Sequence, residues 1–265
     1  GLNGQFLVHI REDINFFLAA VRLARRLREA GLPICQPEIR PLNEHVYEVA
    51  NSYNLNLARH FGLMSSDQSV SLAVVQNDIR LNQTEAIQIL TGPNQGGKTT
   101  YTQMVGINQV LAQAGLYVPG TAARISPVDN IYTHYPLEEE LELSTGRFGD
   151  EAQRLADIFS VASKHSLLLF NESLASTSPG ESIHIAQNIV RILRQMGVRA
   201  IFNTHLHELA ASVDELNASV TGESLIISMI ASAQESDSET GEMQRSEEHT
   251  SELQSRSDLV CRLLL

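Results

Sequence analysis

The sequence predicts an α/β fold with a mainly parallel sheet covered by helices, and two patterns predict it. Short apolar runs typical of buried strands alternate along the chain with longer runs whose apolar residues recur at helical spacing. Strands that alternate with helices of this length usually pair in parallel and are covered on both faces. The second pattern is a glycine-rich turn at residues 92–99, which lies between one such strand and one such helix.

Composition narrows the classes of protein that the chain can represent. Its 265 residues, 43% of them hydrophobic, are enough for one large domain with a core, and no apolar run is long enough to cross a membrane. Two cysteines, Cys35 and Cys261, provide no disulfide framework or metal spacing, which favours the reducing cytoplasm. A net charge of −12 argues against a broad DNA-binding surface on this chain. Any contact with double-stranded DNA would then be made by the remainder of a longer parent protein.

The first 44 residues are expected to form the end of a lever or connector region ahead of a nucleotide-binding domain at 45–232. Apolar residues at helical spacing predict a helix over 12–30, ended by Gly31 and a proline shortly after it. Residues 45–57 alternate loosely and are expected to enter the sheet. The polar face of the helix is read either as a solvated charged face or as a set of phosphate contacts. It carries Arg22, Arg25, Arg26 and Arg28.

The glycine-rich turn matches G-x-x-x-x-G-K-[ST] at every fixed position, the pattern of a P-loop. It follows the apolar strand 86–90 and precedes an amphipathic helix that Gly115 ends. Backbone amides in such a turn surround phosphate oxygens, while Lys98 would reach the β- and γ-phosphates and Thr99 would bind Mg²⁺. The alternative is a glycine-rich turn that binds nothing. The predicted nucleotide-binding residues here are Gly92, Pro93, Asn94, Gln95, Gly96, Gly97, Lys98, Thr99 and Thr100.

Later segments continue the alternation of strands and helices. Strands are predicted at 124–125, 130–135, 167–170 and 199–203, and helices near 152–162 and over 180–196. The strand at 167–170 ends in Asn171 and Glu172, where a P-loop enzyme holds its metal and activates water. Glu172 is expected to orient or deprotonate the attacking water. Asn171 is expected to hold Mg²⁺ through a bound water, more weakly than an aspartate would. The alternative is a strand end that meets solvent.

Two further segments are candidates for phosphate contact. His205 follows the strand 199–203 and would sense or polarise the γ-phosphate, although a surface role is the alternative. Residues 144–151 are polar, contain glycine and precede a helix, so they read either as a loop with a helix cap or as a phosphate-binding helix start.

The character of the chain changes at residue 233. Residues 234–250 are polar and rich in serine and glutamate, which is typical of disorder. Residues 245–255 are similar to the conceptual translation of a sequencing adapter, so 233–265 are expected to be a disordered or artefactual tail. An ordinary acidic tail is the alternative.

Four stretches together resemble the MutS family of DNA mismatch-repair ATPases. The loop at 91–101 has the proline and asparagine that are distinctive of MutS after its first glycine, and 117–133 is similar to the segment that follows. Residues 171–178 resemble the family's Asp-Glu…Thr-Ser-Thr stretch, and 203–209 its Ala-Thr-His…Glu-Leu stretch. The resemblance covers about residues 55–213.

The resemblance implies an ABC-type P-loop NTPase that binds ATP and Mg²⁺ and forms a homodimer through its ATPase domains. Each nucleotide would be closed by the partner's loop, so Ser144 and Gly146 would reach the γ-phosphate of the other subunit. Asn77 matches the adenine-side segment, and the helix 12–30 resembles the end of the MutS lever. Hydrolysis would switch a clamp on DNA, with mismatched-DNA binding and ATP-dependent damage sensing as properties of the parent protein.

The chain departs from the MutS pattern at several positions. Asn171 replaces the usual aspartate, Gln95 replaces a methionine, and 178–180 differ from the family's Tyr-Asp-Gly stretch. These departures indicate a MutS-related branch. They also leave two other functions open: an ATP-binding dimerisation module with little hydrolysis, or another ABC-type ATPase of transport or chromosome-maintenance type.

Overall fold

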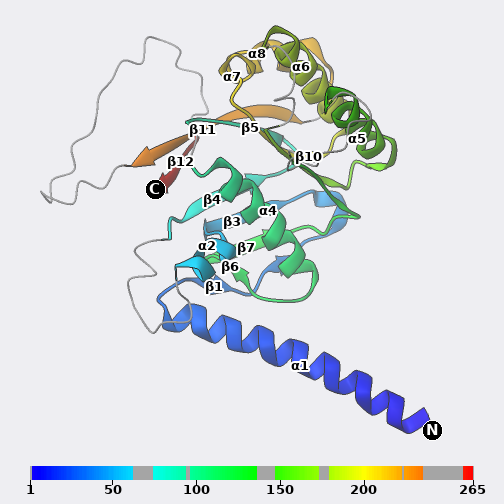
Figure 1. Ribbon diagram of the computed structural model, residues 1–265, viewed down its shortest axis with the longest axis vertical. Coiled ribbons are helices and arrows are strands. Elements are labelled where there is room, and N and C mark those ends of the chain that lie inside the picture. Colours follow the sequence, from blue (N-terminus) through cyan, green and yellow to red (C-terminus); the bar gives the residue numbers. More distant parts are fainter. Residues whose placement is uncertain are drawn as a thin grey trace, which may run out of the picture.

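The largest sheet has six strands, all paired in parallel, in the order β12-β11-β5-β10-β9-β8 (Figure 1). The structure is a computed structural model that describes residues 2–61, 74–93, 96–135, 147–172, 179–222, 224–234 and 259–264. The sheet confirms the predicted α/β class with parallel strands. Its strands are β5 (Glu85–Thr91), β8 (Ile131–His134), β9 (Leu167–Asn171), β10 (Arg199–Asn203), β11 (Leu225–Gln234) and β12 (Leu259–Leu264).

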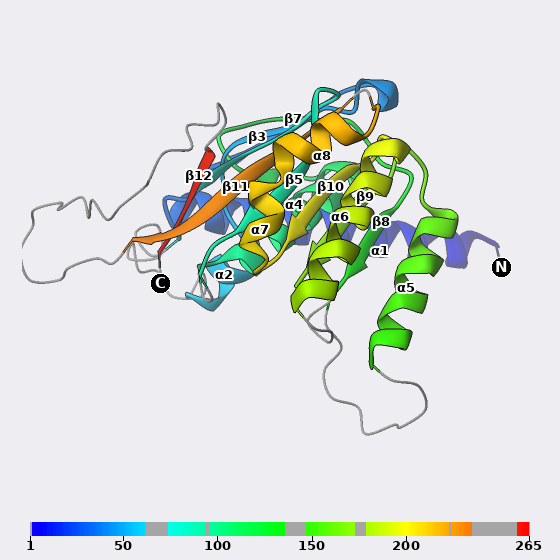
Figure 2. The same cartoon turned by 90° about the horizontal axis from the view of Figure 1, so that it is seen from above.

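Helices cover both faces of this sheet, which explains why its central strands are continuously apolar. Leu168 and Phe170 on β9 pack into the cluster formed with the helices of one face, and Leu167 and Leu169 pack toward α4 (Lys98–Gln113) on the other. The helices of the first face are α5 (Arg147–Val161), α6 (Pro179–Met196), α7 (His207–Ala211) and α8 (Val213–Ser219). Figure 2 shows α6, α7 and α8 lying over the strands and α5 to the side of them.

A second sheet lies beyond α4, in the order β2-β7-β3-β4. Residues 45–57 were expected to enter the main sheet, but β3 (Tyr47–Ser52) pairs antiparallel with β4 (Asn77–Leu81) and β7 (Ala122–Ile125). The chain then turns into α2 (Leu55–His60), capped by Asn54, whose side chain accepts the Leu57 amide at 3.0 Å. The helix α4 therefore packs between two sheets.

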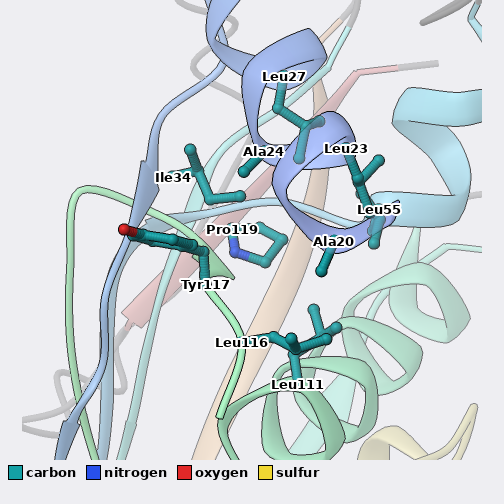
Figure 3. A pocket seen from close by; sticks show the side chains of 10 residues that line it. All are labelled: Ala20, Leu23, Ala24, Leu27, Ile34, Leu55, Leu111, Leu116, Tyr117 and Pro119. Atoms are coloured by element: carbon teal, nitrogen blue, oxygen red, sulfur yellow. The ribbon is translucent and has the colours of Figure 1, made fainter. Parts of the chain in front are cut away.

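The long helix α1 spans Leu2–Glu29, ten residues earlier than the predicted start at 12. Among its residues 10–29, whose burial the structure describes, only those at the base are buried: Leu27 is fully enclosed, whereas Phe17 and Val21 are more than half exposed. In Figure 1 the rest of the helix projects from the body. Figure 3 shows the apolar pocket at its base, which Leu23 and Leu27 line together with Leu55 and Leu111. Within the described residues, no helix has both the length and the hydropathy needed to cross a membrane.

Strand pairing connects both predicted flanking regions, residues 1–44 and 233–265, with the predicted nucleotide-binding domain. β1 (Ile34–Cys35) pairs with β6 (Val118–Pro119), and β2 (Glu38–Ile39) pairs with β7, followed by a short 3₁₀ turn at Leu42–Glu44. At the other end, β11 runs to Gln234 and β12 pairs with it in parallel. Residues 233–234 and 259–264, which fall within the predicted tail, lie in these two strands, where β12 pairs with the edge of β11. The residues between these strands lie outside the described part.

Candidate functional site

Three neighbouring strands bring their polar ends to one edge of the main sheet. Asn203 at the end of β10 lies opposite Leu90 on β5 and Asn171 on β9. Backbone hydrogen bonds continue past the strands: the Glu172 amide donates to Asn203 at 2.9 Å, and the Thr204 amide donates to Leu90 at 3.0 Å. The glycine-rich turn after β5 and the predicted residues after β9 and β10 therefore meet at this edge.

Glycines shape the turn between β5 and α4. Gly92 has a φ of 137°, and a side chain there would collide with the main-chain oxygen of Ala231 on β11. Gly97 has a φ of 72° in the left-handed region and is the residue just before α4. The Gly96 amide donates to the Pro93 oxygen at 3.0 Å, whereas Asn94 and Gln95 lie outside the described residues. The turn thus presents the amino end of α4, which attracts anions.

Lys98 is buried within this turn, with 3% of its surface exposed. Its Nζ donates to the main-chain oxygens of Gly92 at 3.0 Å and Pro93 at 2.9 Å. Burial lowers the pKa of the Lys98 ammonium, while attraction to Glu172 opposes that change. A buried cation held by neutral carbonyls is well suited to bind an anion.

Thr99 and Asn171 form a direct contact between the turn and β9. The Thr99 hydroxyl donates to Asn171 Oδ1 at 2.9 Å, and Asn203 Nδ2 donates to the same oxygen. Asn171 is buried and Asn203 is completely enclosed. The single amide oxygen thus accepts two hydrogen bonds where the family pattern has a carboxylate. The side chain of Asn203 was not among the predicted site residues, because its contact depends on the register of two strands.

Glu172 and His205 face each other across the ends of β9 and β10. His205 Nε2 lies 3.1 Å from Glu172 Oε1, and both side chains are partly exposed. Glu172 has a φ of 51°, a left-handed conformation that is uncommon for a residue with a side chain. The two side chains can therefore be reached from solvent at this edge of the sheet. The carboxylate can accept hydrogen bonds there, and the imidazole can donate one.

A family model described as MutS domain V matches residues 88–249, more than half of the chain. The chain belongs to the MutS family. The match includes the turn, both strand ends and the predicted partner-side loop, while Asn77 lies before it.

Similar proteins carry MutS names from several organisms. The chain is 35% identical over 143 residues to "DNA mismatch repair protein MutS 2" of Halobacterium salinarum, covering 54% of the chain and 17% of that protein. It is 27% identical over 213 residues to "DNA mismatch repair protein MutS" of Lactobacillus johnsonii, covering 79% of the chain and 25% of the relative. The corresponding protein of Chlorobium limicola is 36% identical over 137 residues, 51% of the chain and 16% of the relative. The chain thus spans a quarter or less of these MutS proteins.

The remaining predicted MutS site residues lie at three places. Thr100 is in the first turn of α4, where its main-chain oxygen accepts from Asn54 Nδ2 at 2.8 Å. Asn77 begins β4 in the second sheet, opposite Ser52. Ser144 and Gly146 lie outside the described residues. The Asn54 contact was not predicted, since no local pattern relates α2 to α4.

The oxygen atoms at the turn fit a magnesium ion better than a softer metal. Mg²⁺ prefers oxygen ligands and often takes few from the protein when phosphates and water supply the rest. The Thr99 hydroxyl is such a ligand, and the Asn171 amide oxygen, 2.9 Å from it, can accept a hydrogen bond from a metal-bound water. Among the residues that the structure describes, no cluster of three or more His, Cys, Asp or Glu could hold a metal. The donor set therefore fits Mg²⁺ that is bound together with a nucleotide.

Proposed function

We propose that this chain is the ATPase module of a MutS-like protein related to DNA mismatch repair, and that it binds ATP with Mg²⁺ and hydrolyses it. The observation that carries the proposal is the meeting of Lys98, Thr99 and the Glu172–His205 pair at one sheet edge. Its support is the membership in the MutS family, together with a glycine-shaped turn at a helix start.

Each residue at the edge has a distinct role in the proposed reaction. Lys98 supplies positive charge to the phosphates, Thr99 binds the magnesium ion, and Asn171 holds that ion through a bound water. When bound, Mg²⁺ would neutralise charge that develops on the phosphate oxygens. Glu172 orients the attacking water and accepts its proton. His205 donates its Nε2 hydrogen either to Glu172, as in the observed geometry, or to the γ-phosphate, which it would then polarise.

The same proposal extends to the partners of the chain. We propose a homodimer through the ATPase domains, in which Ser144 and Gly146 complete the partner's nucleotide site. The parent protein would hold double-stranded DNA, including mismatched DNA, and ATP would switch its clamp in the cytoplasm. The names of the relatives, DNA mismatch repair proteins, support this reading.

Single-turnover hydrolysis tests the catalytic role of Glu172. Glu172→Gln keeps the size of the side chain but removes the base, so the rate should fall by about 10²-fold or more. Glu215→Gln on the exposed surface of α8 is the matched control and should hydrolyse at the normal rate. An unchanged rate in Glu172→Gln would remove the catalytic assignment.

A second candidate function is an ATP-binding dimerisation module with little hydrolysis. The observation that favours it is Asn171, a neutral amide whose single oxygen already accepts two hydrogen bonds. Asn171→Asp restores a negative charge, so hydrolysis that rises at least tenfold while ATP affinity changes little would support this function. A wild-type rate already typical of ATPases would argue against it. Another ABC-type ATPase is disfavoured by the match to MutS domain V.

A further inference from the structure

We propose that Asn203 is a positioning residue for the magnesium site, because its side chain fixes which end of the Asn171 amide faces Thr99. The inference rests on the proposed function, since it concerns ATP bound together with Mg²⁺. Asn203 would not touch the nucleotide or the ion. It would act through Asn171.

The geometry joins three side chains from three elements. Asn203 Nδ2 donates to Asn171 Oδ1, and the same oxygen accepts the Thr99 hydroxyl at 2.9 Å. Asn203 and Asn171 are direct neighbours in the parallel pairing of β10 and β9. Neither side chain can move away easily, since Asn203 is completely buried and Asn171 is 6% exposed.

An asparagine at position 171 creates a problem that an aspartate does not have. A carboxylate has two equivalent oxygens and only accepts hydrogen bonds, so both of its orientations serve a metal site. An amide has one oxygen and one NH₂ group, and half a turn of the side chain would direct N–H bonds at Thr99. Such a reversal would place N–H donors where the Thr99 hydroxyl and a metal-bound water need an acceptor. Orientation therefore matters here because the residue is neutral.

Of the two orientations that the paired Asn171 and Asn203 amides could take, the observed one is the less costly in free energy. Asn203 Oδ1 has no hydrogen-bond partner among the described residues, so a reversal of both amides would put the Asn203 NH₂ group at that position. A buried N–H without a partner is rarer in proteins than a carbonyl oxygen without one. Asn203 thus donates to Asn171, and the Asn171 oxygen remains directed at Thr99.

The test measures how much Mg²⁺ strengthens ATP binding. The dissociation constant of ATP is determined with the full chain in Mg²⁺ and again in EDTA, and the ratio of the two values reports the metal site without any turnover. Asn203→Ala should lower this ratio by about tenfold, in the range seen when outer partners of metal ligands are removed. An unchanged ratio would overturn the proposal.

A matched control separates positioning from a general loss of stability. Asn108 on α4 is also completely buried, and its Nδ2 donates to the Ser52 hydroxyl at 2.7 Å. Asn108→Ala should therefore reduce the free energy of unfolding by a similar amount while leaving the Mg²⁺ ratio unchanged. A drop in the ratio with this control equal to that of Asn203→Ala would overturn the proposal. If Asn203→Ala does not fold, Asn203→Ser keeps a polar group in the buried site but is too short to replace the amide donor.

A double-mutant comparison tests the orientation argument itself. In an Asn171→Asp background, Asn203→Ala should change the ratio by no more than a factor of about two, because the two oxygens of a carboxylate are equivalent and need no orienting partner. An equal loss in both backgrounds would overturn the inference and leave the proposed function intact. If the wild-type chain binds no ATP in Mg²⁺ or in EDTA, the proposed function fails and this inference fails with it.

Discussion

Glu172, the proposed base, has a backbone conformation that is unfavourable for any residue with a side chain. Its φ of 51° places it in the left-handed region, where a Cβ costs energy that glycine avoids. Glu172→Gly should therefore be more stable than Glu172→Ala by about 1 kcal/mol, measured by urea unfolding. Both variants lack the carboxylate, so both should hydrolyse ATP equally slowly.

The control for this order of stability, with glycine above alanine, is an exposed position inside a helix. At Gln153 on α5, alanine should instead be more stable than glycine by about 1 kcal/mol, because helices favour alanine. If alanine is also the more stable residue at 172, the left-handed conformation is not populated in solution. The strain would then have no part in directing the Glu172 carboxylate toward His205.

Lys98 is a buried cation whose two observed acceptors are neutral main-chain oxygens. Lys98→Met has a similar length and should weaken ATP binding roughly tenfold to a hundredfold, since hydrogen bonds to charged groups contribute about 1.5–3 kcal/mol. Burial lowers the pKa of Lys98, so the fold stabilises the charged ammonium less than water does, and removing that charge costs the fold little. Stability should therefore fall much less than affinity.

The comparison uses an exposed lysine near the opposite end of β9. Lys164→Met should leave the dissociation constant of ATP unchanged, because Lys164 lies in an exposed turn before that strand. Isothermal titration with ATP and Mg²⁺ gives both values. Equal affinities for Lys98→Met and the wild type would contradict phosphate binding by the turn.

Among the helices and strands, the sequence predicted most accurately the strands that are uninterrupted runs of apolar residues. β5, β9 and β10 are buried on both faces, so each reads as an apolar run whose end can be located. The strand β4 alternates buried and exposed residues over only Asn77–Leu81 and was not predicted as a strand. β3 was predicted to enter the sheet, but its membership of a second sheet depends on partners far away in the chain.

The turn after β5 lies in close contact with β11 at Gly92. Gly92→Ala would place a methyl group against the main-chain oxygen of Ala231 in a φ region that alanine avoids. The free energy of unfolding should fall by about 2–4 kcal/mol, because strand pairing or the turn must shift. Gly180→Ala in α6 has open space around it and should stabilise the chain by up to about 1 kcal/mol. A stable Gly92→Ala chain that keeps ATP affinity would contradict this close approach.

At the scale of the whole molecule, the two sheets and α4 are held together by groups that the sequence does not connect. Arg199 at the start of β10 is completely buried and donates to the main-chain oxygens of Val46, Ser126 and Pro127 at 3.0–3.3 Å. Burial lowers the pKa of Arg199 to about 10, so it still carries its charge at neutral pH. From the sequence, Arg199 was predicted to lie in a strand, but no role was predicted for its side chain. Its contacts, like those of Asn203, appear only once strands and loops from distant parts of the chain are adjacent.

The proposed dimer can be tested by mixing two inactive variants. Lys98→Met disables the site of its own subunit, whereas Gly146→Arg would disable the site of the partner. Mixed in equal amounts, half of the dimers would be heterodimers with one intact site of two, so about a quarter of the wild-type hydrolysis rate should return. A mixture of Lys98→Met with Glu172→Gln should recover nothing, because both residues act within their own subunit and every site lacks one of them. Recovery in that control, or its absence in the first mixture, would contradict a site completed by the partner's residues 144–146.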